Sequence, residues 1–155
     1  MSSYAGFWKR ALACLIDGLL LGAVGMLLLI PFFGLLGLGI GFSDMENADP
    51  ASAGFLVAAI AAYGVAMLII TIGGWLYYAI MESSRKQATL GKMALGIVVT
   101  DMNGDRLTFG RATGRYFGKI LSSLIFYIGY IMAGFTQQKQ ALHDILASTL
   151  VINKL

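Results

Sequence analysis

The chain has 155 residues, of which 58% are hydrophobic and only 12% are charged. Soluble domains typically carry about 25% charged residues, so the composition excludes an ordinary soluble domain and predicts a single integral membrane domain over residues 1–155. The net charge is +3, but the 11 basic residues lie outside the apolar runs, which favours anionic lipid headgroups as partners and argues against nucleic acid.

Two apolar runs are predicted to cross the bilayer as helices, at about 8–30 and 53–81. The first would be about 34 Å long, enough for a hydrocarbon core of about 30 Å, and it is too long for a cleaved signal peptide. Pro31 is expected to end or kink this helix, and the glycine-rich stretch 32–42 either extends it or folds back.

Charge patterning predicts the orientation of these spans. The segment 43–50 is acidic, whereas residues 82–110 and the N-terminus are basic. The positive-inside rule therefore places the N-terminus and the loop 82–110 in the cytoplasm, in a multi-pass protein. Within that loop, β-prone residues 97–100 and 106–109 flank Asn103-Gly104, which predicts a small cytoplasmic hairpin.

The region 111–135 is predicted to begin as a basic amphipathic helix. Arg111, Arg115 and Lys119 recur every four residues, so they share one helical stripe that we expect to face lipid headgroups. The apolar part, 120–135, is only marginally long enough to cross a bilayer, so it either completes a third span or dips in and returns.

The tail 136–155 ends in a β-prone stretch. A lone strand is unstable, and the cytoplasmic hairpin is the nearest partner for it. This pairing favours a cytoplasmic C-terminus and a re-entrant third segment. The predicted fold class is a mainly helical integral membrane protein with a small sheet.

Three blocks of the sequence resemble the RDD family of bacterial membrane proteins: 4–10 with Asp17, 88–99 and 142–151. The family's name refers to an arginine at the mouth of the first helix, an aspartate within it and a second aspartate, which correspond to Arg10, Asp17 and Asp144. Ser148 stands where the tail motif more often has glycine. The resemblance implies a bacterial inner-membrane protein with a suggested role in transport, and some members have been linked to sodium/proton exchange.

The charged residues of these blocks are the candidate site. Arg10 and Asp17 are two helical turns apart, too far for direct contact, so we expect Asp144 to pair with Arg10. Asp17 is either a packing anchor or a cation or proton site. As an anchor it would be protonated, or hydrogen-bonded to Ser122, Thr71 or a basic side chain of the amphipathic helix. His143 either relays protons with Asp144 or has a structural role, as a cap or a hydrogen bond at the membrane surface.

Three classes of function remain open on these grounds. The protein is a small-ion or solute transporter that needs a homo-oligomer to enclose a path, or a non-catalytic membrane module that binds anionic lipid or a partner protein. An enzyme is the least supported class, because the sequence has no nucleophile–base pair, cofactor loop or metal cluster. We therefore expect no catalytic residues, metal or cofactor.

Overall fold

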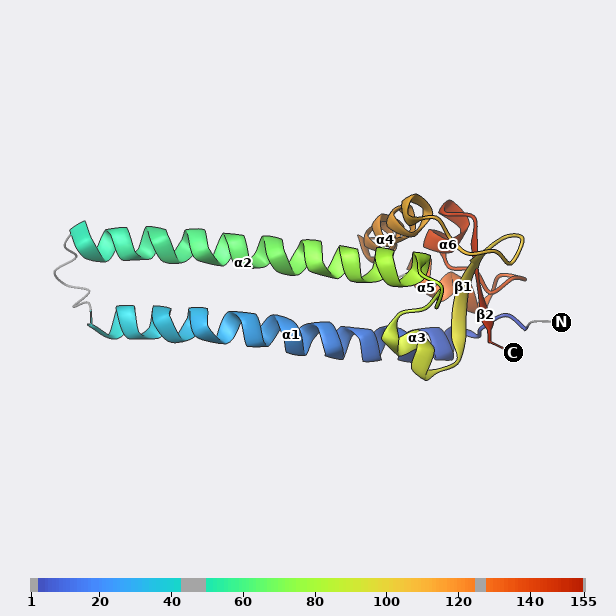
Figure 1. Ribbon diagram of the computed structural model, residues 1–155, viewed down its shortest axis with the longest axis horizontal. Helices are drawn as coiled ribbons and strands as arrows, with labels where there is room; N and C mark the ends of the chain where they lie inside the picture. Colours follow the sequence, from blue (N-terminus) through green and yellow to red (C-terminus); the bar gives the residue numbers. More distant parts are fainter. Residues whose placement is uncertain (1–2, 43–49, 125–127, 155) are drawn as a thin grey trace. The chain divides into compact units, whose positions relative to one another are not determined.

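A computed structural model describes residues 3–42, 50–124 and 128–154, so the acidic segment 43–49 lies outside the described residues. The chain forms two compact units. Unit 1 joins Met1–Leu19 to Trp75–Leu155, and unit 2 consists of Leu20–Gly74. The fold is mainly helical with a small two-stranded sheet, which confirms the predicted fold class (Figure 1).

Two long helices correspond to the predicted spans: α1 (Phe7–Phe42) and α2 (Pro50–Ser83). Within the described parts of the chain, these two helices are long and apolar enough to cross a membrane by themselves. Pro31 lies inside α1 and does not end it. Proline is tolerated in such helices because nearby groups can satisfy the backbone carbonyl that it leaves free.

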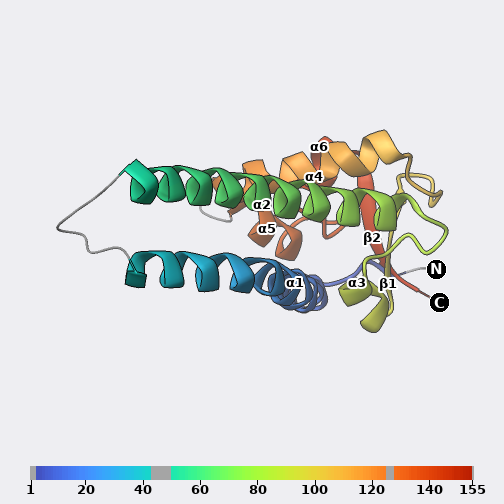
Figure 2. The same cartoon turned by 60° about the vertical axis from the view of Figure 1, so that its left-hand side comes forward.

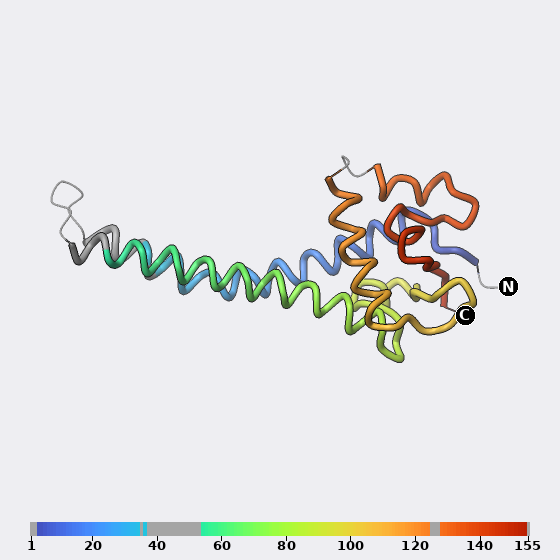
Figure 3. The backbone as a smooth tube through the Cα atoms, turned by 90° about the horizontal axis from the view of Figure 1, so that it is seen from above, coloured from blue at the N-terminus to red at the C-terminus, as the bar shows by residue number. Residues whose placement is uncertain are grey.

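Unit 2 is an antiparallel pair of helical segments, one from α1 and one from α2 (Figure 3). The rings of Phe32 and Tyr63 lie 5.4 Å apart, and Ile70 packs near Gly25. Since residues further along α1 meet residues earlier in α2, the two segments run in opposite directions. Large apolar side chains such as Leu27 and Ile60 are exposed, as expected for surfaces that face lipid or another subunit.

The sheet of unit 1 joins the middle of the chain to both ends. Strand β1 (Ile97–Asp101) pairs antiparallel with β2 (Thr149–Asn153), and Val99 lies opposite Val151. The N-terminus adds a further contact, because the Ala5 N–H donates to the Val151 carbonyl at 2.9 Å. The predicted pairing of the C-terminal strand with the loop 82–110 is therefore confirmed.

The prediction that residues 106–109 form the second strand of a hairpin is wrong. The turn itself forms, since the Asp101 carboxylate accepts the N–H groups of Asn103 and Asp105 at 2.9 Å each. Residues 105–108 make no ladder, however, and helix α4 (Phe109–Leu124) begins directly after them. The Thr108 hydroxyl accepts the Arg111 N–H at 3.3 Å and so caps this helix instead of extending a strand.

The remaining elements of unit 1 are short: α3 (Leu90–Ala94), α5 (Ile128–Ile131), the 3-10 turn η2 (Met132–Gly134) and α6 (Leu142–Leu146). Helix α4 runs beside the last turns of α2, where Trp75 contacts Phe117 and Tyr78 contacts Tyr116 (Figure 2). The direction of the chain changes by 116° between α4 and the α5–η2 segment. A bend of this size is that of a broken span or of a re-entrant segment.

Candidate functional site

The main polar feature of unit 1 is a chain of buried ion pairs that begins at Asp144. This carboxylate, in the first turn of α6, is fully buried and pairs with Arg10 of α1 and with Arg115 of α4. The Arg115 Nη2 atom lies 2.7 Å from Asp144 Oδ1. The predicted pair of Arg10 and Asp144 is therefore present. The second cation beside Asp144, Arg115, was not predicted as its partner.

Glu82, near the end of α2, continues this chain. Its Oε2 atom lies 2.6 Å from Arg115 Nη1, and its Oε1 atom accepts both Lys92 Nζ at 2.5 Å and Lys119 Nζ at 3.3 Å. We call the six side chains the charge network: Arg10, Glu82, Lys92, Arg115, Lys119 and Asp144. Four cations thus share two carboxylates.

Burial and pairing act in opposite directions on the groups of the charge network. Burial acts to raise the pKa of Asp144, but the guanidinium groups of Arg115 and Arg10 outweigh it and hold that pKa well below its ordinary value. For Lys92 burial dominates and lowers the pKa to about 7, although Glu82 opposes it. Asp144 is therefore ionised at neutral pH.

The three cations of the stripe that was predicted to face headgroups differ in exposure. Arg115 is 1% exposed and bound on both sides, so the prediction that it faces headgroups is wrong. Lys119 is largely buried, with Nζ 3.8 Å from the centre of the Tyr78 ring, whereas the Arg111 side chain is 49% exposed and pairs with Asp101. Sequence periodicity showed which residues share a face of α4, but not that Glu82 packs against that face.

Asp17 is buried among neutral donors. Its Oδ1 atom accepts the Tyr77 hydroxyl at 2.7 Å and the Gly91 N–H at 2.8 Å, while Oδ2 accepts the Thr89 hydroxyl at 2.5 Å. The partners suggested from the sequence were therefore wrong. The short α3 sits so close that a Cβ atom on Gly91 would lie 2.2 Å from the Ala13 carbonyl oxygen. Asp17 thus links α1 to α3 and to the end of α2 through hydrogen bonds.

His143 packs beside the charge network as a neutral group. Its Nδ1 atom lies 3.4 Å from Ser122 Oγ, and its ring lies 5.0 Å from that of Tyr130. Burial is the main cause that lowers its pKa to about 2. The His143 Nε2 atom lies 3.5 Å from Asp144 Oδ1, so the distances to Ser122 and Asp144 are similar, and the lowered pKa is what argues against a proton relay. In the described ranges, no group of three His, Cys, Asp or Glu side chains is placed to hold a metal ion.

A pocket of about 590 Å³ adjoins the charge network, and we call it the charged pocket. Apolar residues of the first turns of α1 form one wall, and the polar lining includes Asp17 and His143. Four network cations also line it: Arg10, Lys92, Arg115 and Lys119. The pocket therefore combines hydrocarbon walls with an excess of positive charge.

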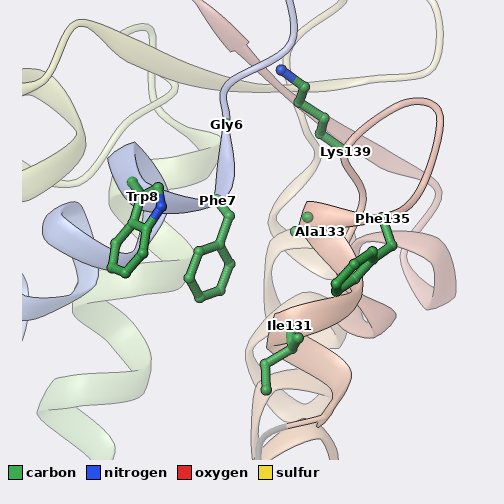
Figure 4. A pocket seen from close by; sticks show the side chains of 8 residues that line it. Gly6, Phe7, Trp8, Ile131, Ala133, Phe135 and Lys139 are labelled. Atoms are coloured by element: carbon green, nitrogen blue, oxygen red, sulfur yellow. The ribbon is translucent and has the colours of Figure 1, made fainter.

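A second pocket of about 400 Å³, the aromatic pocket, lies beside the first. Phe7, Ile131 and Ala133 line both pockets. Figure 4 shows the Phe7 and Phe135 rings on opposite sides of the opening, with Ile131 between them. The two pockets are therefore neighbouring compartments that share part of their lining.

Sequence reasoning found part of this site. It selected all three family residues, but it overlooked Glu82, the central acid of the charge network, and Lys92. Glu82 directly follows an apolar run, and a carboxylate at the end of a span opposite a basic helix was a usable signal. No sequence signal pointed to the Tyr77 and Thr89 hydroxyls as partners of Asp17.

These features define a helical membrane protein with a buried charge network at one end of its long helices. The RDD family model matches residues 4–148, so the chain belongs to the RDD family. It is 37% identical over 155 residues to the uncharacterized protein YxaI of Bacillus subtilis strain 168, covering 99% of this chain and 100% of the relative. It is 34% identical to the uncharacterized membrane protein YteJ of the same organism, covering 98% of this chain and 82% of the relative. No solved structure matches the chain.

Proposed function

We propose that this protein moves a small ion or solute across the bacterial inner membrane, with the charged pocket as its binding site. The observation that carries the proposal is a pocket of about 590 Å³ whose lining includes four basic side chains, one carboxylate and one imidazole: Arg10, Lys92, Arg115, Lys119, Asp17 and His143. Ionisable groups within apolar helical segments are costly, and they commonly mark the path of a substrate or ion. The pocket volume is also in the range of small-molecule sites.

The charge of the pocket favours an anion over a cation as the bound species. The four cations of the charge network share two carboxylates, so a bound anion would balance part of the excess positive charge. Asp17, the acid that a cation would need, already accepts three hydrogen bonds. Cation/proton exchange through Asp17 is therefore the less favoured version of this function.

Transport requires more than one copy of the chain, because two spanning helices cannot enclose a path by themselves. The proposal accordingly includes a homo-oligomer. Exposed apolar side chains of unit 2, such as Leu27 and Ile60, would supply the subunit contacts. We place the N-terminus in the cytoplasm, in accordance with the basic residues near it.

Flux measurements on the purified protein in liposomes test this proposal. We expect chloride or phosphate flux above that of empty liposomes, and loss of this flux in Lys119→Gln when equal amounts of folded protein are compared. Lys9→Gln is the matched control, because Lys9 precedes Arg10 but binds Asn153 outside both pockets. A folded wild-type protein that carries neither anions nor sodium and protons would contradict transport altogether.

Asp17→Asn separates the two versions of transport. If Asp17 is an anchor, the variant loses thermal stability and its residual anion flux follows the amount of folded protein. If sodium/proton exchange occurs and disappears in a variant of wild-type stability, Asp17 is an ion site and the anion version is wrong.

A second candidate is a non-catalytic membrane module that binds anionic lipid. The outer face of α4 supports this candidate, because Phe117, Ile120 and Leu121 are exposed on the same helix as the exposed cation Arg111. Such a face suits the boundary between acyl chains and headgroups. Native mass spectrometry would test it, since Arg111→Gln should then reduce the phosphatidylglycerol that stays bound relative to the wild type.

A further inference from the structure

We propose that the charged pocket and the aromatic pocket together bind one single-chain amphiphile with an anionic head. The head, a carboxylate or a phosphate monoester, would lie among the network cations, and the chain would pass Phe7 and Ile131 into the aromatic pocket. This inference rests on the proposed function, because it takes the charged pocket as the binding site and specifies the class of ligand.

Lys92 and Lys119 are the groups best placed to receive the head. Both residues line the charged pocket, and both ammonium groups approach the same atom, Oε1 of Glu82. An ammonium group has three N–H donors, so this shared acceptor uses only part of their capacity. A second oxyanion beside Glu82 would accept from both lysines and would balance the excess positive charge.

Hydrocarbon surface surrounds these cations. One wall of the charged pocket is made by successive turns of α1, at Phe7, Ala11 and Leu15, and another by Tyr130 and Ile131. A small inorganic anion would leave these walls uncovered. A hydrocarbon chain would bury them at a gain of roughly 25 cal/mol per Å² of apolar surface removed from water.

The opening of the aromatic pocket suits entry from the bilayer. Trp8 is 82% exposed and Phe135 is 87% exposed, and both line this pocket (Figure 4). Exposed aromatic residues of this kind are typical of the membrane–water interface. An amphiphile could therefore enter between Phe7 and Phe135 from the level at which its own head lies in the bilayer. Because the charged pocket is about 590 Å³, we commit to a free single-chain ligand and not to a two-chain phospholipid.

Direct binding tests the class of ligand. The full-length protein would be held in nanodiscs of zwitterionic phosphatidylcholine, and retention of radiolabelled dodecanoate would be compared with empty nanodiscs. We expect saturable binding that dodecyl phosphate displaces and that dodecanol and dodecyltrimethylammonium do not. Equal displacement by dodecanol or the cationic amphiphile would overturn the anionic head, and equal displacement by phosphatidylglycerol would overturn the single-chain ligand.

Cys14 locates the bound ligand, because it is the single cysteine of the chain and it lines the charged pocket. At about ten times the Kd, dodecanoate should slow alkylation of Cys14 by N-ethylmaleimide about tenfold, in proportion to occupancy. Saturable binding without this protection would place the ligand elsewhere and overturn the proposal. If Cys14 of the free protein does not react, Leu15→Trp provides the same information, since an indole in the pocket should abolish dodecanoate binding.

Substitution of Lys119 tests whether this side chain binds the anionic head of the ligand. Lys119→Gln should weaken dodecanoate binding at least about tenfold, roughly the contribution of one charged hydrogen bond, whereas Lys9→Gln should leave binding unchanged. An equal loss in both variants would mean general electrostatic attraction and would overturn the proposal. Anion flux without amphiphile binding would overturn this inference alone, whereas the absence of any flux would contradict the proposed function.

Discussion

Among the described residues of unit 1, the three buried acids are compensated in two different ways. Asp144 and Glu82 face guanidinium or ammonium groups, whereas Asp17 accepts hydrogen bonds from two hydroxyls and one backbone N–H. Removal of one partner from a buried ion pair leaves an uncompensated charge, which costs more than the pair contributes. The acids of the charge network should therefore be far more sensitive to neutralisation than exposed acids.

Neutralisation of Asp144 tests whether the acids of the charge network are more sensitive than exposed acids. Asp144→Asn leaves Arg10 and Arg115 without a shared anion, so we expect the free energy of unfolding to fall by about 3–5 kcal/mol. The control is Arg111→Gln, which breaks the exposed pair with Asp101 and should cost about 0–1 kcal/mol. Thermal unfolding in detergent measures both, and equal small losses would contradict a stabilising role for the charge network.

The lowered pKa of His143 predicts that the stability of the fold depends on pH. Its pKa is about 2 in the folded chain, chiefly because of burial, and about 6.5 when unfolded, so the unfolded state binds more protons as the pH falls below 6.5. Stability is therefore fully present above pH 6.5 and is lost on acidification. The His143 ring lies near one carboxylate and three cations: Asp144, Arg10, Arg115 and Lys119.

The loss attributable to His143 should reach at most about 2 kcal/mol at pH 5. Unfolding of the wild type and of His143→Gln would be compared at pH 7.5 and pH 5. The wild type should lose stability between these values, and the variant, which has no imidazole to protonate, should lose much less. Parallel losses in the two proteins would assign the pH dependence to other groups.

Among the elements, helix α3 is too short to be stable alone and is stabilised by its contacts with α1. It has five residues, and its position depends on the approach of Gly91 to α1 and on the hydrogen bonds that Thr89 and Gly91 give to Asp17. Isolated helices of this length are not stable in water. The docking of α3 should therefore depend on the absence of a side chain at position 91.

Gly91→Ala tests this docking. The added methyl group would lie 2.2 Å from the Ala13 carbonyl oxygen, so α3 must move and its bonds to Asp17 must lengthen. We expect a loss of about 1–3 kcal/mol in stability, typical of overpacking. Gly114→Ala is the control, because the space around that position in α4 is open and alanine favours a helix by up to about 1 kcal/mol. A Gly91→Ala variant as stable as the wild type would show that the contact is not tight.

At the scale of the whole molecule, the two ends of the chain belong to one structure. Ala5 bonds to Val151, Lys9 bonds to Asn153, and Arg10 pairs with Asp144. These contacts form only if the N-terminal residues and the tail lie on the same side of the membrane. They therefore predict a topology in which both ends of the chain lie on one side of the membrane.

Reporter fusions at each terminus test this constraint. Green fluorescent protein and alkaline phosphatase fused separately to the N-terminus and the C-terminus should report the same side of the membrane, and the basic residues predict the cytoplasmic side. Termini on opposite sides would contradict the re-entrant segment and the pairing of β1 with β2. Both termini outside would keep the fold but reverse the predicted orientation.

The sequence by itself determined the class of protein, the two long helices, the strand at the C-terminus and the pair of Arg10 with Asp144. These features follow from local composition, from periodicity and from the need of a buried charge for a counter-charge. Only the tertiary structure decided that Glu82 joins Arg115 to two lysines, that Asp17 is held by neutral donors, and that the charged pocket lies beside them. The reason is physical: periodicity specifies which residues share a face of a helix, but the partner of each buried charge depends on which element packs against that face.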